Sequence, residues 1–584
     1  MGTADKASNG LNPSRPKESR ARWAQFDWRW TGALAALFAG ALTLRVWSIG
    51  HGLPYAYNVD EAGHFAPLAV GMLDSGWNPH YFENPPAFTY LLKLIFTARW
   101  GQTGTVNTWI VDPTPIWLTA RWTTAVLGSL SCVLTAVAGR RLFSKEVGVI
   151  AGLVLATATL PVLYAHFALN DVPATVPVLL VLIAAINLRG DYNRLRDYLL
   201  AGLGIGLAAS TKYTAAIVAV ALLVAVLPKG RGAIKGLCLT GGAAALTFFV
   251  TNPFAILDLH AFREGLTLQS DFAARKLVGL GDTTGILYYG RTLTWGLGWI
   301  PFAAAVAGAI WMLTRKPERS KALLLLSMPV SLLLALSLNL LLTGEGQAYS
   351  RWFLPAYPFL CLLAAWLVVA FARTGFPHRG RIANVIIVGA TALLCLQGIW
   401  QSVRVDRILS KTDTRQSARN WMVASVPRDT LVALDPYVVP PAWEQNTFWA
   451  RPPLSGQPGD IWQVAKPFVT TLNPTLVTRF RKEGRCWVVQ SSTITDRALS
   501  EPAYAPGAVG YRKALDASSV PGPSWSPWKA SAGHPKFDFD RSYLYFDGTY
   551  RRPGPLITVR RLFGGRCGTR SHAIRTVALA NKAV

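Results

Sequence analysis

The sequence has few charged residues for its length. Charged side chains make up 15% of its 584 residues, whereas typical soluble proteins carry about 25%. A chain of several ordinary soluble domains is therefore excluded. Intrinsic disorder is excluded as well, because hydrophobic residues make up 51% of the chain and disorder requires low hydrophobicity.

Acidic residues are scarcer still. The chain has 31 Asp and Glu against 58 Lys and Arg, which gives a formal net charge of +27. Such a basic excess is typical of nucleic-acid-binding proteins or of the cytoplasmic loops of membrane proteins. Here the basic residues lie in short loops rather than in one stripe, so nucleic acid is not the expected partner.

Long apolar segments recur between residues 32 and 400. Each approaches the roughly 20 residues that cross a bilayer core about 30 Å thick. The chain is therefore predicted to be a multispan α-helical membrane protein. About eleven transmembrane helices are expected, over residues 32–49, 116–137, 147–166, 172–188, 198–211, 213–227, 236–250, 293–313, 322–342, 352–371 and 382–400.

The basic loops orient these spans. Basic residues favour the cytoplasmic side, and they occupy the N-terminal arm and alternate loops near residues 140–145, 189–196, 229–235, 315–321 and 373–381. We therefore expect a multi-pass protein of the plasma membrane with a cytoplasmic N-terminus. The arm lacks a short apolar region followed by a small-residue cleavage site, so the first span is expected to be an uncleaved anchor.

Three regions follow from this pattern. Residues 1–30 form a cytoplasmic arm, residues 31–402 a transmembrane catalytic domain with a large first outside loop (50–115), and residues 403–584 an extracytoplasmic mixed α/β domain. In the last region we predict a helix over 415–425, strands over 430–434, 485–490, 542–546 and 556–559, and loops over 452–459 and 521–527. Cys486 and Cys567 both lie there, and a disulfide between them is left open.

The outside loop 50–115 carries the first candidate site residues. Asp60 and Glu61 stand side by side, and Glu83 follows in an aromatic and proline-rich run. One alternative is that Asp60 caps a helix over 62–73 while Glu61 favours its first turn. Arg45, near the outer end of the first span, either snorkels to the interface or pairs with this acidic loop.

Further polar residues recur at the same face of the membrane. Asp171 is either functional or an N-cap, and His166 is either functional or a hydrogen-bonded core residue. Lys212 interrupts residues 198–227, where basic loops on both sides require an even number of spans, so we expect two short spans meeting at Lys212. With Arg351, these residues suit one chemistry. A carboxylate can accept a hydroxyl proton, and cations can stabilise a phosphate leaving group.

At these residues the sequence resembles the type C glycosyltransferases, multispan enzymes that use polyprenyl-phosphate-linked sugars. It is most similar to the branch of protein O-mannosyltransferases and aminoarabinose transferases. The resemblance is carried by Asp60-Glu61, Glu83-Asn-Pro-Pro86, His166…Asn170-Asp171, Gly202-Leu-Gly-Ile-Gly206…Ser210-Thr-Lys212-Tyr213 and Arg351-Trp-Phe-Leu-Pro355. Asn84 is a departure, because a Lys often follows the loop Glu in the aminoarabinose branch.

The resemblance implies an integral-membrane glycosyltransferase with Asp60 as general base. The enzyme would move a sugar, with inversion, from a polyprenyl-phosphate donor to an extracytoplasmic hydroxyl of a glycan, lipid or protein. The candidate residues are Asp60, Asp171, Glu83 and Glu61 for catalysis, and Lys212, Arg351, His166 and Arg45 for the donor phosphate.

A metal and a second functional class also stay open. Some type C enzymes use a divalent metal, for which Asp60, Glu83, Asp171 and either His166 or His260 offer ligands without a tight spacing. The alternative function is a membrane transporter or lipid flippase, because intramembrane charges also mark such pathways. Many transporters contain internal repeats, and no convincing repeat relates the two halves of the spans.

Overall fold

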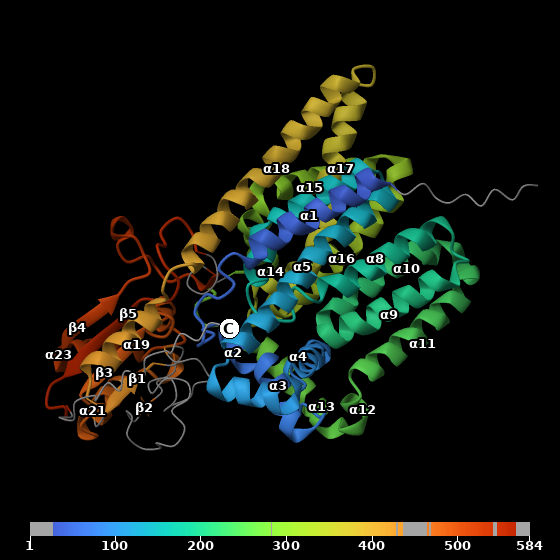
Figure 1. Ribbon diagram of the computed structural model, residues 1–584. Helices are drawn as coiled ribbons and strands as arrows, with labels where there is room; N and C mark the ends of the chain where they lie inside the picture. The colour runs from blue at the N-terminus through green and yellow to red at the C-terminus, as the bar shows by residue number, and fades with distance from the viewer. Residues whose placement is uncertain are drawn as a thin grey trace, which may run out of the picture.

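The computed structural model describes residues 27–281, 283–427, 430–435, 438, 464–465, 469–540 and 546–567. A large helical part is followed by a small five-stranded sheet, which lies to one side of the helices (Figure 1). The predicted fold class, a multispan helical protein with a C-terminal mixed α/β part, is confirmed. The number of spans stays a prediction. By length and composition, six helices in the described part of the chain can cross a membrane.

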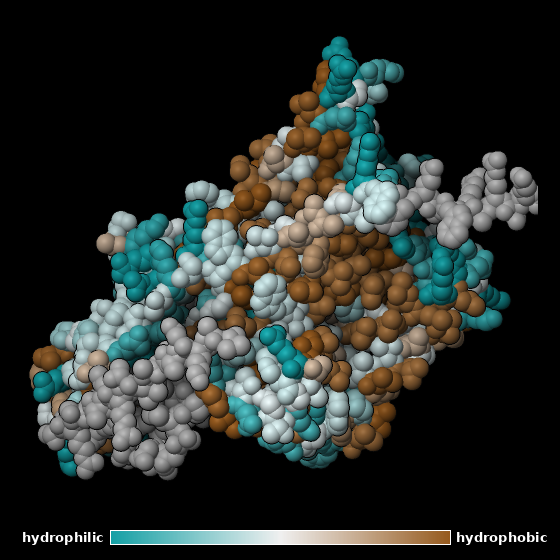
Figure 2. Space-filling view, viewed as in Figure 1, coloured by the Kyte–Doolittle hydropathy of each residue, from teal (hydrophilic) through white to brown (hydrophobic). Residues whose placement is uncertain are grey.

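Each predicted span overlaps at least one helix. The helices of this part are α1 (Trp28–Val46), α2 (Val59–Gly63), α3 (Ala66–Ser75), α4 (Ala87–Val111), α5 (Thr114–Leu142), α6 (Lys145–Thr157), α7 (Thr159–Tyr164), α8 (Thr175–Gly190), α9 (Leu195–Thr211), α10 (Ala219–Val226), α11 (Ile234–Thr251), α12 (Phe254–Leu257), α13 (Leu259–Ala274), α14 (Gly285–Leu293), α15 (Trp299–Thr314), α16 (Lys316–Thr343), α17 (Tyr357–Gly375) and α18 (Gly380–Leu409). Apolar side chains cover much of the outside of this part (Figure 2), as expected of a protein surrounded by lipid.

Glycines bring α9 close to two neighbouring helices. A Cβ atom on Gly202 would lie 2.6 Å from the Cβ of Ala243 in α11, and one on Gly204 would lie 2.7 Å from Cγ2 of Val181 in α8. Small residues allow such close approach between helices in a membrane. The glycine-rich segment therefore serves to pack α9 between α8 and α11.

The predicted interruption at Lys212 is present. Helix α9 ends at Thr211, Lys212 has an extended backbone, and a 3₁₀ helix (Tyr213–Val218) follows before α10. The packing of α9 thus helps to fix the place where this helix ends, directly before Lys212.

The C-terminal part is an α/β unit. It contains α19 (Thr414–Ser425), β1 (Val432–Leu434), β2 (Val464–Ala465), α21 (Pro474–Lys482), β3 (Trp487–Ser491), α22 (Thr495–Ser500), α23 (Ala508–Ser518), β4 (Ser519–Trp525) and β5 (Ile557–Leu562). The strand order is β2-β1-β3-β5-β4, in which β1 runs parallel to β2 and β3, while β5 runs antiparallel to β3 and β4. The sheet packs on the helical part through Tyr55 and Tyr57, which share a hydrophobic cluster with Met422 and Val489.

Several predictions for this region are confirmed and one is wrong. Helix α19 and strands β1, β3 and β5 overlap their predicted ranges. The disulfide between Cys486 and Cys567, which the sequence left open, is present, with the two Cα atoms 5.1 Å apart. The predicted loop over 521–527 is largely strand β4, because Pro521 and Pro523 are tolerated in an edge strand whose register shifts between residues 521 and 524. The predicted loop 452–459 and residues 542–545 of a predicted strand lie outside the described residues.

Candidate functional site

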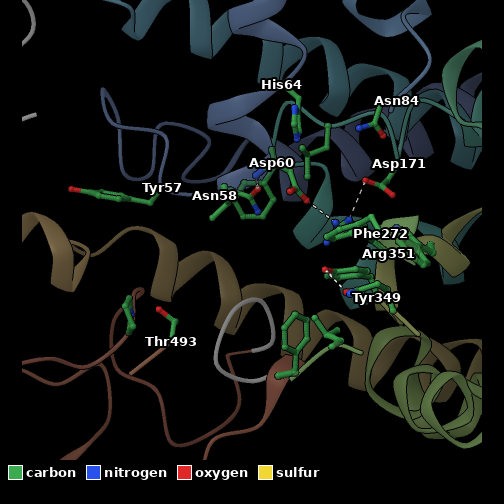
Figure 3. Close-up of a pocket in the computed structure, with 18 of the residues that line it drawn as sticks. Tyr57, Asn58, Asp60, His64, Asn84, Asp171, Phe272, Tyr349, Arg351 and Thr493 are labelled. Carbon is green, nitrogen blue, oxygen red and sulfur yellow. Dashed lines mark hydrogen bonds and ion pairs between the residues drawn. The ribbon is translucent and has the colours of Figure 1, made fainter. Parts of the chain in front are cut away.

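A cavity of about 840 Å³ lies where the helical part meets the C-terminal part (Figure 3). Its lining comes from the outside loop after α1, the segment after α7, the start of the 3₁₀ helix Ser350–Ala356, and the C-terminal part. Asp60, Glu83, Asp171, Lys212 and Arg351 all line it. Five of the eight candidate residues, far apart in the sequence, are therefore brought to one cavity.

Asp60 is not a helix cap. Asn58 caps α2, because its Oδ1 atom accepts hydrogen bonds from the backbone amides of Asp60 and Glu61, both at 3.1 Å. The predicted single helix over 62–73 is also wrong, because the chain breaks between α2 and α3 at Phe65, which has a positive φ of 47°. The carboxylate of Asp60 is thereby free to face the cavity.

Asp171 is not a cap either. Helix α8 begins later, at Thr175, with Ala174 as its N-cap. Just before Asp171, the side chain of Asn170 donates a hydrogen bond of 2.7 Å to the carbonyl of Thr211 at the end of α9. This bond holds the segment after α7 against the chain that leads into Lys212.

Four charged side chains form a continuous row across the cavity. Nζ of Lys212 lies 2.6 Å from Oδ1 of Asp171, Nε of Arg351 lies 3.7 Å from Oδ2 of Asp171, and Nη2 of Arg351 lies 2.6 Å from Oδ2 of Asp60. The guanidinium of Arg351 also stacks over Tyr349, 4.3 Å from the ring centroid. Two cations and two carboxylates alternate, so this charge row (Lys212–Asp171–Arg351–Asp60) carries no net charge.

Glu61 lies outside this cavity. It is fully buried and accepts two hydrogen bonds from Arg121, from Nε at 2.7 Å and Nη2 at 2.8 Å, and a third from the amide of Ala168 at 2.8 Å. Arg121 also donates to the carbonyls of Ile49 and His51. Sequence reasoning missed Arg121, although a charged residue inside an apolar span is a signal in itself.

Arg45 and His166 do not line the cavity, and we assign neither to the donor phosphate. Arg45 is buried and donates to the carbonyls of Leu155 and Ala156 in α6, so it neither snorkels nor pairs with the acidic loop. His166 is fully buried, with its ring nitrogens 2.9 Å from the carbonyl of Val162 and 2.8 Å from that of Trp47. Its geometry is that of the hydrogen-bonded core residue.

Two further residues of the cavity were missed. His64 stacks on Tyr81 with ring centroids 5.0 Å apart, and both line the cavity near Glu83. Burial holds the pKa of His64 below its ordinary value, although Asp60 and Glu83 act to raise it. Burial therefore favours the neutral form of His64. In the sequence, the one signal for a role of His64 was its place four residues after Asp60.

Backbone strain is concentrated in loop 50–115. In the described chain, the non-glycine residues with positive φ are Ser48, Ala56, Phe65 and His80, all within or directly before loop 50–115. Such conformations cost roughly 1–3 kcal/mol each and cluster at functional sites. The strain supports a functional role for this loop.

The far wall of the cavity belongs partly to the C-terminal part. Thr493 lines the cavity just beyond β3, and Arg497 of α22 donates a 2.6 Å hydrogen bond to the carbonyl of Val278. Glu501 accepts hydrogen bonds from the amides of Gly279 (3.0 Å) and Gly281 (2.6 Å). These bonds clamp the segment between α13 and α14 onto the C-terminal part.

Asp540 forms a second link between the C-terminal part and the helical part, through Tyr288 of α14, and makes the stability of the protein depend on pH. Burial raises its pKa to about 7, while its hydrogen bond from Tyr288 (2.8 Å) and the nearby Arg291 lower it and Asp538 raises it. The pKa of Asp540 is higher in the folded state than in the unfolded state. Its contribution to the free energy of unfolding is therefore complete below about pH 4 and is lost as the pH rises through 7.

We therefore expect the melting temperature of the wild type, relative to that of Asp540→Asn, to fall between pH 5 and pH 8. Asn keeps an acceptor for the hydroxyl of Tyr288 but does not titrate. The measurement is thermal unfolding of both purified proteins across this range. Parallel pH profiles would contradict the assignment.

The charge row does not suit a divalent metal. Asp60 and Asp171 each face a cation of the protein, and His260, like His166, does not line the cavity. Within the described ranges, no three His, Cys, Asp or Glu side chains are grouped as a metal site requires.

Comparison with known proteins agrees with this architecture. Residues 117–256 match the family model of dolichyl-phosphate-mannose-protein mannosyltransferase. A lipid A galacturonosyltransferase of Rhizobium johnstonii is 30% identical over 175 residues, which is 29% of this chain and 35% of the relative. The match thus spans about a third of the relative's length.

Solved structures extend the likeness to most of the chain. ArnT of Cupriavidus metallidurans, bound to undecaprenyl phosphate, superposes with a TM-score of 0.52 at 13% identity, over 91% of this chain and 98% of ArnT. The fold of this chain is therefore similar to that of ArnT. The Archaeoglobus fulgidus oligosaccharyltransferase also superposes, with a TM-score of 0.50 at 14% identity over 86% of this chain and 74% of the other.

Proposed function

We propose that the protein is an integral-membrane glycosyltransferase that moves a sugar from a polyprenyl-phosphate donor to an acceptor hydroxyl. The observation that carries the proposal is the charge row, which sets two carboxylates and two cations in one cavity beside an apolar helical part. The type C fold and the match to a family of dolichyl-phosphate-dependent enzymes support it.

Lys212 and Arg351 would bind the donor phosphate. Both are held at the cavity by Asp171, which lies within 3.7 Å of each. Once the donor is bound, cations held at the phosphate stabilise the charge that develops on it as it leaves. Asp171 is thus a positioning residue in this mechanism.

Asp60 would act as the general base. Its partner Arg351 is the group that the phosphate attracts, so donor binding would draw the guanidinium away and leave the carboxylate ready for the acceptor proton. The acceptor oxygen then attacks the anomeric carbon opposite the departing phosphate. The bond from that carbon to the phosphate oxygen breaks, the proton stays on Asp60, and the configuration inverts.

The orientation proposed is a cytoplasmic N-terminus with the cavity and the C-terminal part outside, in the plasma membrane. Basic loops on the opposite side of the membrane support it. The Cys486–Cys567 disulfide is consistent with an oxidising compartment. The acceptor, a glycan, lipid or protein hydroxyl, would reach Asp60 along the wall that carries Thr493 and Arg497.

The test is direct transfer by the purified full chain in a bilayer disc. A polyprenyl-phosphate sugar is supplied with a hydroxyl acceptor, and release of polyprenyl phosphate is measured together with the anomeric configuration of the product. Sugar transfer with inversion supports the proposal. Movement of the lipid between leaflets without release of the sugar would instead establish a transporter.

Replacing Arg351 with Ala should weaken donor use more than acceptor use. The variant removes the cation shared by Asp60 and Asp171, and a charge-assisted contact of this kind is worth roughly 1.5–3 kcal/mol. We expect the donor KM to rise at least about tenfold with a much smaller change in the acceptor KM. Steady-state kinetics with each substrate varied in turn check this. An equal rise in both would count against a phosphate contact.

A further inference from the structure

One wall of the cavity carries an acidic side chain outside the charge row. Glu83 is half-buried and lines the cavity with Asn84, Tyr81 and His64. Asp60 and Arg351 pair with each other, as do Asp171 and Lys212. In the described parts of the chain, no Lys or Arg forms an ion pair with Glu83. Glu83 therefore stands outside the ion pairs of the charge row, in a cavity that Arg275, Lys276, Arg415 and Arg497 also line.

This wall joins the two ends of the charge row. At one end, the hydroxyl of Tyr213, the residue after Lys212, donates a 3.0 Å hydrogen bond to the carbonyl of Phe82. At the other, His64 follows Asp60 by four residues and stacks on Tyr81. Both Asp60 and Glu83 act electrostatically on His64 and on Tyr81. Residues 81–84 thus contact both Tyr213, next to Lys212, and His64, four residues after Asp60.

The sugar of the donor has to lie along the same path. In the proposed function, its anomeric carbon is bonded to a phosphate at Lys212 and Arg351 and is attacked by a hydroxyl at Asp60. A ring held between these points would lie in the cavity that Tyr81, Glu83 and His64 line. This wall offers the sugar ring a stacked aromatic pair, the amide of Asn84 and one carboxylate, but no cation.

We propose that Glu83 selects the donor by charge, so that the protein transfers a sugar without an anionic group and rejects uronic acids. The inference rests on the proposed function and deepens it. A carboxylate on the sugar would meet Glu83 in a partly buried cavity, where like charges repel strongly. The hydroxyls of a neutral sugar could donate hydrogen bonds to Glu83. The partial match to a galacturonosyltransferase, over 29% of this chain, therefore does not extend to the sugar.

The geometry of Asn84 fits this selection. Its side-chain amide donates a 2.7 Å hydrogen bond to the hydroxyl of Tyr81, so it is held within the wall. A Lys at position 84 would place a cation beside Glu83 and offset its charge. With Asn there, the carboxylate of Glu83 sets the charge of this wall.

The test compares binding of two lipid-matched donors, a polyprenyl-phospho-hexose and a polyprenyl-phospho-hexuronic acid, to the full chain in bilayer discs. Each affinity is normalised to that of polyprenyl phosphate without a sugar. The wild type should prefer the hexose by about tenfold or more, equivalent to about 1.4 kcal/mol. In Glu83→Gln, the preference should shrink to about threefold or less. High salt should narrow the wild-type preference as well, because it screens charge.

Asp74→Asn is the matched control. Asp74 lies exposed in α3 of the same loop and does not line the cavity, so this variant should keep the wild-type preference. Equal wild-type affinity for both donors would overturn the inference, as would a preference that Glu83→Gln leaves unchanged. If Glu83→Gln does not fold, the wild-type ratio and its salt dependence decide alone. No binding of polyprenyl phosphate at all would instead defeat the proposed function, and the inference with it.

Discussion

Asp60→Asn is expected to slow sugar transfer by about 10²–10⁴-fold, the usual contribution of a positioned general base. The amide keeps the size of the side chain but no longer takes the acceptor proton. Arg351 keeps a carboxylate partner in Asp171, 3.7 Å away, and Asn58 still caps α2. We therefore expect the melting temperature to change little.

The measurement pairs single-turnover transfer, with donor and acceptor saturating, with thermal unfolding of the same preparation. Asp74→Asn again serves as the control, because it removes a carboxylate of the same loop that does not line the cavity. A wild-type rate in Asp60→Asn would refute the assignment of the base.

Glu61→Gln is expected to act on stability rather than on chemistry. The substitution breaks a buried ion pair in which the carboxylate of Glu61 accepts hydrogen bonds from both Nε and Nη2 of Arg121. Removing one partner leaves an uncompensated buried charge, which costs about 3–5 kcal/mol. The melting temperature should fall markedly, and folded enzyme should retain much of its turnover.

A double-mutant cycle separates this pair from its surroundings. Arg121→Gln alone should be destabilising to a similar degree, and the double variant should lose less than the sum of the two single changes. The readout is the free energy of unfolding in detergent, with the transfer rate corrected for the folded fraction. If Glu61→Gln unfolds like the wild type but transfers as slowly as Asp60→Asn, then Glu61 belongs to the chemistry.

Asp60 and Glu61 are thus expected to differ in role because their ion-pair partners lie in different parts of the chain. A single sequence does not reveal these partners. Asp60 meets Arg351, 291 residues away, and Glu61 meets Arg121, 60 residues away. Nothing in the local pattern distinguishes a carboxylate that faces a cavity from one that fills a buried pair.

What could be predicted depended on strong physical constraints. Hydrophobic spans follow from the thickness of a bilayer, and charges at the membrane edge are costly enough to mark Asp171, Lys212 and Arg351 as candidates. Where two residues can take one local role, the sequence left the choice open. Asn58 and Asp60 are both good N-caps, and the structure uses Asn58.

Tertiary context decided the remaining differences. Strand β4 contains Pro521 and Pro523, which read as loop residues, and only its place at the edge of the sheet makes it a strand. Arg45 had polar partners close at hand in the backbone carbonyls of α6, which no charge pattern shows.

The residues that line the cavity are synthesised in a fixed order along the chain. Its lining begins at His51 and ends at Pro555, so the wall is complete only after nearly all of the chain has been synthesised. The charge row is present once Arg351 has been inserted. Residues 493–497 and 553–555, which line the cavity farther along the chain, arrive about 140 to 200 residues later, at a synthesis rate of about 5–20 residues per second. The growing chain therefore holds all four members of the charge row for some seconds before the cavity around them is enclosed.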